Sequence, residues 1–504
     1  MENIELPINQ PKKTSKKKNR LFEKLREFIF DEKLLNPLGL SFLLIISILI
    51  AFAIKQSGFV IGALLLIAIV GMPILYAIIV YPKFGIIVLL IAAYIIMGII
   101  RIGINFPLGT LMDALQALLI LGFLVNQKFH PNWKIFKDPI SFIILIWIAY
   151  NLFEFFNPIA ESRLAWVYTI RSVAVVMLTY FIFTYYIRTV EFIRIIIKVW
   201  LALSIIAAAW AFKQEHFGFF NYEAQSLDSD LIRNLLFIDG HWRKFSIFSD
   251  PTAFSYNMVI SILLCLALMT LPISIWKKII LGGMIVFFIQ TMLYSGTRGA
   301  YVLLPVGVAM FAILNYSKKI LALAIAGAFF LIILIFMPTS NPTLHRFQSA
   351  FKPSNDASFN VRKMNQKRIQ PYILTHPIGG GLGATGVWGQ RFSPNSFLAN
   401  FPPDSGYLRV AVELGWIGLF IICTLMFIVL KTGIENFFKI KNPELKSYCL
   451  AMVLIVFALN IGNYPQEALV QFPINIYFYL VVALINITLR LDQQDNQILH
   501  ERDH

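Results

Sequence analysis

The chain has 504 residues and a formal net charge of +16; 58% of its residues are hydrophobic and only 14% are charged. A soluble protein of this length would carry about a quarter charged residues, so the composition excludes a water-soluble enzyme. Apolar runs of about 17–25 residues, long enough to cross a bilayer, recur along almost the whole chain. A β-barrel would show short alternating segments instead. We therefore expect an all-α polytopic membrane protein.

The positive charge does not indicate a nucleic-acid partner. The basic residues stand mainly in short loops between apolar runs, where membrane topology accounts for them. The three cysteines, Cys265, Cys423 and Cys449, lie inside apolar runs, without the spacing of a disulfide framework or a metal site. We expect no nucleic-acid partner, no metal and no cofactor.

Residues 1–36 are predicted to form a basic cytoplasmic tail. The segment INQPKKTSKKKNRLFEKLREF is basic and then amphipathic, which is typical of a segment lying against anionic lipid headgroups. A disordered segment that anchors the topology fits the same pattern. Because a polar stretch of this length precedes the first apolar run, we expect no cleavable signal peptide.

The apolar runs predict about 12–14 transmembrane helices in three groups. The N-terminal group lies within 37–212, the central group within 253–338 and the C-terminal group within 405–489, and a cytoplasmic tail follows at 490–504. The predicted spans are 37–54, 59–80, 85–100, 106–125, 139–156, 164–187, 191–212, 253–271, 277–295, 299–316, 320–338, 405–430, 447–462 and 471–489.

Basic residues between the spans predict the sidedness. If the tail is inside, every even-numbered span returns to the cytoplasm. The inner loops then hold Lys83, Lys128, Lys134, Lys137, Arg188, Arg194, Lys277, Lys278, Lys318, Lys319, Lys431, Lys439, Lys441 and Lys446. The short outer loops hold only Lys55, Arg101 and Arg163. The positive-inside rule thus places both termini in the cytoplasm and two long loops, 213–252 and 339–404, outside.

The outer loops carry the candidate functional residues, because loops of this length in a compact fold are usually functional. Arg243 stands in HWRKFSIFSDPTAF, and Arg298 stands at a span end in SGTRGA. Arg362 and Arg368 belong to NVRKMNQKRIQPYILTHPIGGGLG, and Asp404 opens a span in FPPDSGYLRVAVELG. Before Asp404, the second loop has seven basic residues against one acidic residue, a surplus that favours diphosphate or anionic glycan.

The outer face limits the chemistry. Nucleotide cofactors are absent there, so the energy for bond formation must arrive with the substrate, as in a lipid-linked diphosphate sugar. Arginine binds phosphate oxygens bidentately and stays ionised, so Arg243 and Arg298 are predicted to stabilise the leaving group. Asp404 is the candidate base for the attacking hydroxyl. A free Asp is a weak base, and burial at a helix mouth would strengthen it.

These residues also have structural interpretations. Arg298 suits an interfacial residue that extends its charge to water, and Asp404 suits a helix N-cap. Arg409 and Glu413 are spaced i,i+4 and are expected to pair. The run HPIGGGLG at 376–383 lacks the GK[ST] ending of a phosphate loop, so a tight backbone fold is expected, with amide contacts to substrate as the alternative.

Three further charged residues, Asp113, Glu154 and Arg171, fall within predicted spans. Intramembrane charges are functional candidates by default. Pairing between helices explains them equally well, so both interpretations stay open.

Together these segments resemble the O-antigen ligase and O-antigen polymerase (Wzy-type) superfamily of bacterial envelope glycosyltransferases. The similarity covers about 241–420 and keeps the order of the family's motifs. The matching positions are Arg243, Ser246, Phe248 and Pro251; Arg298 and Gly299; Arg362, Pro377, Gly381 and Gly383; and Asp404, Tyr407, Leu408, Glu413, Gly415 and Gly418.

The resemblance implies a GT-C-like helical fold in the bacterial inner membrane. It implies metal-independent, inverting transfer of glycan from undecaprenyl diphosphate to a lipid or glycan acceptor at the periplasmic face. Beside the candidate catalytic residues Asp404, Arg298 and Arg243, the expected substrate-binding residues are Arg362, Arg368, Tyr407, Gly381 and Gly383.

One departure bears on the type of transfer. Ligases of this superfamily usually carry His-Asn where this chain has Asp404-Ser405. An acid there is similar to the polymerase-like branches, so polymerisation of O-antigen or exopolysaccharide repeat units is the leading prediction. Attachment of glycan to lipid A-core or another acceptor by a ligase is the alternative.

Two other classes of function fit the sequence less well. A transporter or lipid flippase would place its key charges near mid-membrane and would show matched halves with broken helices. The strongest candidates here lie at one face, and the sequence has no internal repeat. A non-catalytic scaffold of an export complex would not need Arg243, Arg298 and Asp404 to converge.

Overall fold

The computed structural model describes residues 74–502 apart from 103–107, 228, 239 and 353–356, with isolated positions at 41, 44, 45, 47, 48, 51 and 71. The chain divides into two compact units, Met1–Tyr76 and Ala77–His504. The predicted basic tail and most of the spans predicted at 37–54 and 59–80 lie outside the described residues. All features below belong to the second unit.

The fold is that of an all-α polytopic membrane protein. In the part of the chain that the structure describes, eleven helices are long and apolar enough to cross a membrane, and α14 is a shorter apolar helix. The helices are α4 (Pro82–Arg101), α5 (Leu108–Phe129), α6 (Pro139–Phe153), α7 (Arg163–Val173), α8 (Leu178–Tyr186), α9 (Val190–His216), α12 (Pro251–Leu268), α13 (Ile275–Tyr294), α14 (Arg298–Leu314), α15 (Lys318–Phe336), α20 (Gly415–Lys439), α21 (Pro443–Gly462) and α22 (Ile474–Arg502). Helices α7 and α8 form one span through the 3₁₀ turn η4 (Val175–Met177). Every predicted span from 85–100 onward has a helical counterpart.

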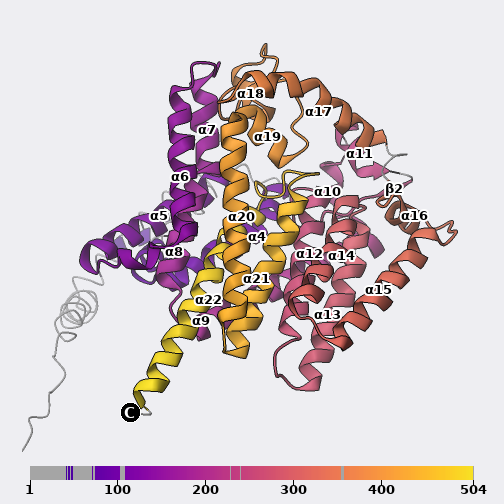
Figure 1. Ribbon diagram of the computed structural model, residues 1–504. Helices are drawn as coiled ribbons and strands as arrows, with labels where there is room; N and C mark the ends of the chain where they lie inside the picture. The colour runs from indigo at the N-terminus through magenta and orange to yellow at the C-terminus, as the bar shows by residue number, and fades with distance from the viewer. Residues whose placement is uncertain are drawn as a thin grey trace, which may run out of the picture. The chain divides into compact units, whose positions relative to one another are not determined.

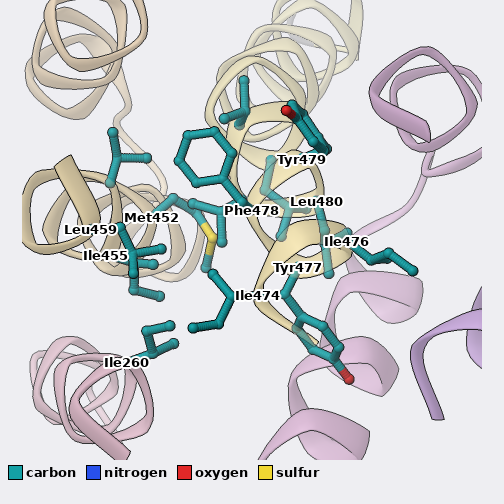
Figure 2. Packing of buried hydrophobic residues seen from close by; sticks show 14 of the residues in the cluster. Ile260, Met452, Ile455, Leu459, Ile474, Ile476, Tyr477, Phe478, Tyr479 and Leu480 are labelled. Atoms are coloured by element: carbon teal, nitrogen blue, oxygen red, sulfur yellow. The ribbon is translucent and has the colours of Figure 1, made fainter. Parts of the chain in front are cut away.

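The centre of this unit consists of α12, α21 and α22. The apolar stretches of these helices are 89%, 78% and 83% buried, whereas that of α15 is 0% buried. Figure 2 shows Met452 and Ile455 of α21 facing Ile474 and Phe478 of α22, with Ile260 of α12 beside them. Close packing of this kind holds membrane helices together, because lipid tails offer no hydrophobic drive to associate.

The two long loops are themselves largely helical. The first contains α10 (Asn221–Gln225), α11 (Asp230–Leu236) and the strands β1 (Phe237–Ile238) and β2 (His241–Trp242), which pair antiparallel with Phe237 opposite Trp242. The second contains α16 (Pro342–Ser349), α17 (Ala357–Thr375) and α18 (Gly386–Phe392), and α19 (Gly406–Glu413) follows it. The short 3₁₀ turns η2 (Trp133–Phe136) and η3 (Glu154–Phe156) flank α6. Figure 1 draws the elements of both loops at one end of the long helices of this unit.

The prediction of one continuous span at 405–430 is wrong. Helix α19 ends at Glu413, and α20 starts anew at Gly415, whose φ is +66°. A Cβ at Gly415 would overlap the carbonyl oxygen of Pro377. The close approach of the 376–383 segment therefore breaks the helix, because only glycine tolerates both the left-handed backbone and the contact.

Each of the three charged residues that the sequence placed within spans, Asp113, Glu154 and Arg171, has a polar partner. Arg171 of α7 donates to the Asp113 carboxylate of α5 over 2.5 Å. The carboxylate of Glu154 accepts a hydrogen bond from the Asn157 side chain over 2.8 Å. Of the two interpretations left open by the sequence, pairing is thus the one observed for Asp113 and Arg171.

Replacing Gly415 with Ala is expected to lower the free energy of unfolding by about 1–3 kcal/mol, because the residue must keep a positive φ while its new methyl group meets the Pro377 carbonyl. The measurement is the thermal unfolding midpoint of the full chain in detergent. The matched control is Gly327→Ala in α15, where nothing lies within 4 Å of the added Cβ and helix propensity gains up to about 1 kcal/mol. Equal midpoints for Gly415→Ala and wild type would contradict the assigned cause of the helix break.

Candidate functional site

Two arginines from different loops bind the turn between α13 and α14. Arg243 donates from Nε to the Ser295 carbonyl oxygen over 2.9 Å and from Nη2 to the Thr297 hydroxyl over 3.0 Å. Arg346 of α16 donates from Nε to the Gly296 carbonyl oxygen over 2.7 Å. Gly296 has a φ of +60°, and a Cβ there would lie 2.8 Å from the Arg346 Nε, so the turn admits the arginines only because it is glycine.

Positive charge accumulates at this turn. Burial, together with the nearby charges of Arg346 and Arg298, lowers the pKa of Arg243 to about 10, although Asp250 opposes the shift. At neutral pH the guanidinium is still ionised. Besides the Ser295 and Thr297 contacts, its Nη1 donates to the carbonyl oxygen of Leu235, so all three acceptors are neutral. A bound anion would relieve the repulsion between these groups, so the turn, with Arg298 as first residue of α14, favours an anionic ligand.

An apolar cavity of about 720 Å³ adjoins this arginine cluster, which we define as Arg243, Arg298 and Arg346. The cavity lies between α13, α14, α15 and α16, and α15 lines it with the small residues Ala324, Gly327 and Ala328. Leu293, Tyr301 and Thr343 line both this cavity and the narrow cleft that holds Arg243 and Arg346. The arrangement suits an amphiphile with a long hydrocarbon tail and an anionic head.

Asp404 lines a different cavity of about 230 Å³, between α17, the start of α19 and the turn after α21. Arg362 and Lys363 of α17 and Tyr464 line the same cavity. Within the described residues, no side chain forms a hydrogen bond or ion pair with the Asp404 carboxylate or the Arg362 guanidinium. Both charged groups are therefore available to a molecule in the cavity.

Asp404 is not the N-cap of the helix that follows. The cap of α19 is Ser405, whose hydroxyl accepts a hydrogen bond from the Leu408 amide over 3.3 Å. The sequence-based alternative of a capping role for Asp404 is therefore wrong by one residue. An acid at position 404 is not needed to begin the helix.

Asp404 and the arginine cluster lie at the same end of the long helices but line separate cavities, and Tyr256 of α12 stands between the elements that carry them. Its hydroxyl donates to the Gly462 carbonyl at the end of α21 over 3.2 Å, and a Cβ at Gly299 would lie 2.9 Å from the same hydroxyl. Arg362 lies within electrostatic range of Tyr256. Helices α12, α14 and α21 thus meet at a buried phenol that sequence reasoning missed, since an apolar span gave it no distinguishing signal.

Glu413 holds the glycine-rich segment. Its carboxylate accepts from the Gly383 amide over 3.0 Å and from the Thr385 amide and hydroxyl over 3.2 and 2.5 Å. The predicted pair with Arg409 is confirmed at 3.1 Å, and Arg409 also binds Glu467 over 2.8 Å.

The amides of Gly381 and Gly383 hold this fold. The Gly381 amide donates to the Glu413 carbonyl oxygen over 2.9 Å, and the Gly383 amide donates to the Glu413 carboxylate. Both have positive φ, and a Cβ on either would overlap a neighbouring residue, Ala160 or Thr169. The prediction that their amides contact substrate is corrected, because both donors are occupied.

Two other predicted substrate-binding residues lie outside the cavity that contains Asp404. The Tyr407 hydroxyl hydrogen-bonds Asn460 of α21. Arg368 is exposed, and its guanidinium lies 5.4 Å from the centre of the Phe397 ring. Of the predicted substrate-binding residues, only Arg362 shares the cavity with Asp404.

Residues 283–423 match the family model described as O-Antigen ligase. The matched region contains Arg298, Arg346, Arg362 and Asp404, and Arg243 precedes it. No curated protein matches the chain. The family match supports the O-antigen ligase and polymerase superfamily and indicates O-antigen ligase-type glycosyl transfer by a multi-pass bacterial membrane protein.

Replacing Glu413 with Ala is expected to lower the free energy of unfolding by about 3 kcal/mol, because it leaves the buried Gly383 and Thr385 donors unpaired and removes one partner of Arg409. The unfolding midpoint and the rate of proteolysis within 376–400 measure the effect. Glu413→Gln keeps a hydrogen-bond acceptor but loses the charge. Its unfolding midpoint is expected to lie between those of the wild type and Glu413→Ala. A Glu413→Ala protein as stable and as protease-resistant as wild type would contradict the role of this carboxylate.

Proposed function

We propose that the protein transfers glycan from undecaprenyl diphosphate at the periplasmic face of the bacterial inner membrane and polymerises O-antigen or exopolysaccharide repeat units. The observation that carries the proposal is the apolar cavity that adjoins the arginine cluster through Leu293, Tyr301 and Thr343. A polyprenyl diphosphate donor has matching parts, because a long hydrocarbon tail ends in a strongly anionic head.

In this proposal the donor tail lies between α14 and α15, and the diphosphate lies at the arginine cluster. Charge develops on the phosphate oxygens as the bond to the sugar breaks. Guanidinium groups fixed by the Ser295–Thr297 turn stabilise that charge without reorganising, and the low polarity around them strengthens the interaction. The diphosphate leaves with the electron pair of the broken bond.

The acceptor glycan enters by the cavity with Asp404. Its hydroxyl oxygen attacks the anomeric carbon directly, which inverts that carbon, and the hydroxyl proton passes to the Asp404 carboxylate. Arg362 and Lys363 of the same cavity hold the acceptor by hydrogen bonds. Donor and acceptor meet near the head of α14, where Arg298 begins the helix and Tyr256 packs against Gly299.

A ligase is the second candidate function, and the family description, O-Antigen ligase, favours it. Asp404-Ser405 in place of His-Asn is the feature that favours polymerisation. A flippase or transporter is less well supported. Arg171 and Asp113 within the spans pair with each other, and Asp404, whose carboxylate has no partner among the described residues, lies at one end of the helices. The distribution of lysine and arginine supports cytoplasmic N- and C-termini and a periplasmic site.

Arg243→Ala and Arg298→Ala are each expected to lower glycan transfer by about 100-fold or more, since each removes a donor to the leaving group. Asp404→Asn should lose transfer but keep the fold, because Ser405 caps α19. Transfer is measured with purified protein and a polyprenyl-diphosphate oligosaccharide, and the product is analysed in cells. Single-repeat capped lipid in the variant strains indicates a polymerase, and long lipid-linked chains left unattached indicate a ligase.

The matched control is Lys367→Ala, an exposed basic residue on the helix that carries Arg362 and outside the Asp404 cavity. It should retain wild-type transfer. Normal product length and yield from either arginine variant would contradict the proposed binding of the diphosphate by that arginine. Wild-type turnover by Asp404→Asn would contradict the assignment of Asp404 as the base.

Gly327→Trp is expected to reduce transfer from the polyprenyl donor at least ten-fold by filling the apolar cavity, chiefly through a higher KM for donor. The space for a side chain at Gly327 is open, and α15 has no buried residue whose packing the change would disturb. Ile325→Trp, at a 60% exposed position of α15 that does not line the cavity, is the control. Equal donor KM values for the two variants would rule out the cavity as the site of the tail.

A further inference from the structure

A third cavity, of about 160 Å³, lies at the same end of the molecule and has no part in the chemistry proposed above. It is lined by residues within 159–165 at the N-terminus of α7, by Tyr372 of α17, by the 380–384 segment and by the 393–398 loop. We propose that this cavity is a saccharide subsite that holds the glycan chain beyond the sugar that reacts. The inference rests on the proposed function and identifies where that function's polymeric substrate is bound.

The lining has the chemistry of a sugar site. Glu161 supplies a carboxylate that, among the described residues, has no hydrogen bond or ion pair, and Ser393 and Ser396 line the cavity beside it. Sugar hydroxyls donate to carboxylates in strong charge-assisted bonds and exchange hydrogen bonds with serine. A diphosphate or an anionic lipid headgroup would be repelled by Glu161. The carboxylate therefore favours a neutral polyhydroxyl ligand over an anion.

Aromatic rings form the other wall. The Tyr372 ring stacks on His376, with centres 3.9 Å apart and planes inclined by 11°. Phe397 lines the same cavity, with its ring 6.4 Å from Tyr372 and 47% of its surface exposed. The C–H face of a pyranose is apolar and packs against such rings, so the cavity offers both surfaces that a sugar needs.

Helix α17 connects this cavity with the one that contains Asp404. Asn365 lines the Asp404 cavity, and Tyr372, seven residues later, lines the saccharide subsite. Seven residues bring the helix back to within about 20° of the same face and advance it by about 10 Å. Between them, Arg368 lies over the Phe397 ring. A glycan extended along this face would reach from one cavity to the other and pass Arg368.

The floor of the subsite is fixed by the elements that position Asp404. The Gly380 amide donates to the Val412 carbonyl oxygen of α19 over 2.9 Å, and a Cβ at Gly380 would lie 2.8 Å from the Tyr372 hydroxyl and overlap Leu398. Helix α19 begins directly after Asp404-Ser405. Helices α17 and α19 together therefore fix the distance between the two cavities. A fixed distance allows a repeating polymer to bind in one position relative to Asp404.

Ser396→Trp, which fills the cavity, tests the inference. The probes are fluorescently labelled, lipid-free oligosaccharides of one to four repeat units, prepared from the surface polysaccharide of the producing strain. Binding to the full-length protein in detergent is measured by fluorescence polarisation. We expect at least ten-fold weaker binding of the longer probes to Ser396→Trp, a smaller change for the single repeat, and shorter polymer in cells. Asn395→Trp, at the adjacent exposed position outside the cavity, should bind like wild type.

Glu161→Gln covers the case in which Ser396→Trp fails to fold. Because the Glu161 carboxylate has no partner in the described part of the chain, the variant should keep the unfolding midpoint of the wild type. Its affinity for the longer probes should fall at least three-fold. Wild-type binding of all probes by both variants, or the same affinity of wild type for short and long probes, overturns the subsite. Asp404→Asn separates the two proposals, since it should bind the probes normally and lose transfer. Full transfer by Asp404→Asn would remove the catalytic proposal and leave the binding result intact.

Discussion

The buried carboxylate of Glu413 is the interaction on which the polar end of the molecule depends. It bonds the Gly383 and Thr385 amides and pairs with Arg409, which also binds Glu467 in the turn after α21. A buried charge is tolerated only when it is paired and fully hydrogen-bonded. The glycine-rich segment, α19 and the turn after α21 are therefore positioned together, and the two cavities along α17 take their shape from this arrangement.

A second constraint keeps opposite charges apart. The three side-chain hydrogen bonds of Arg243 go to neutral acceptors, and the Asp404 carboxylate has no partner among the residues described. If the Arg243 guanidinium and the Asp404 carboxylate paired with each other, neither charged group would be available to a substrate. The cost of desolvating Arg243 is visible in its lowered pKa. Stabilisation elsewhere, as in the Glu413 network and the packed centre of α12, α21 and α22, offsets that cost.

The bilayer makes the apolar cavity between α14 and α15 possible. In water, a helix whose apolar stretch is 0% buried would collapse onto its neighbours or aggregate. In lipid, hydrocarbon surrounds the exposed side chains, and no hydrophobic drive closes the gap. A helix can then stand apart from the bundle, and a lipid tail can replace bilayer lipid in the space it leaves. The same physics that stabilises the fold thus provides access from the plane of the membrane.

The spans from 85–100 onward, except the one at 405–430, the gathering of the long loops at one end and the pairing of Arg409 with Glu413 could be predicted from the sequence. Bilayer thickness and the need to satisfy every backbone hydrogen bond leave a long apolar run little choice but a helix, and i,i+4 spacing on a helix is a local property. Tertiary structure alone decided the rest. Pro377 approaches Gly415 and breaks a run that looked continuous, Arg243 and Arg346 meet at Gly296 from distant segments, and Glu413 occupies the amides that seemed open to substrate. These contacts join residues far apart in the chain, and no local pattern encodes which partner the folded chain brings within reach.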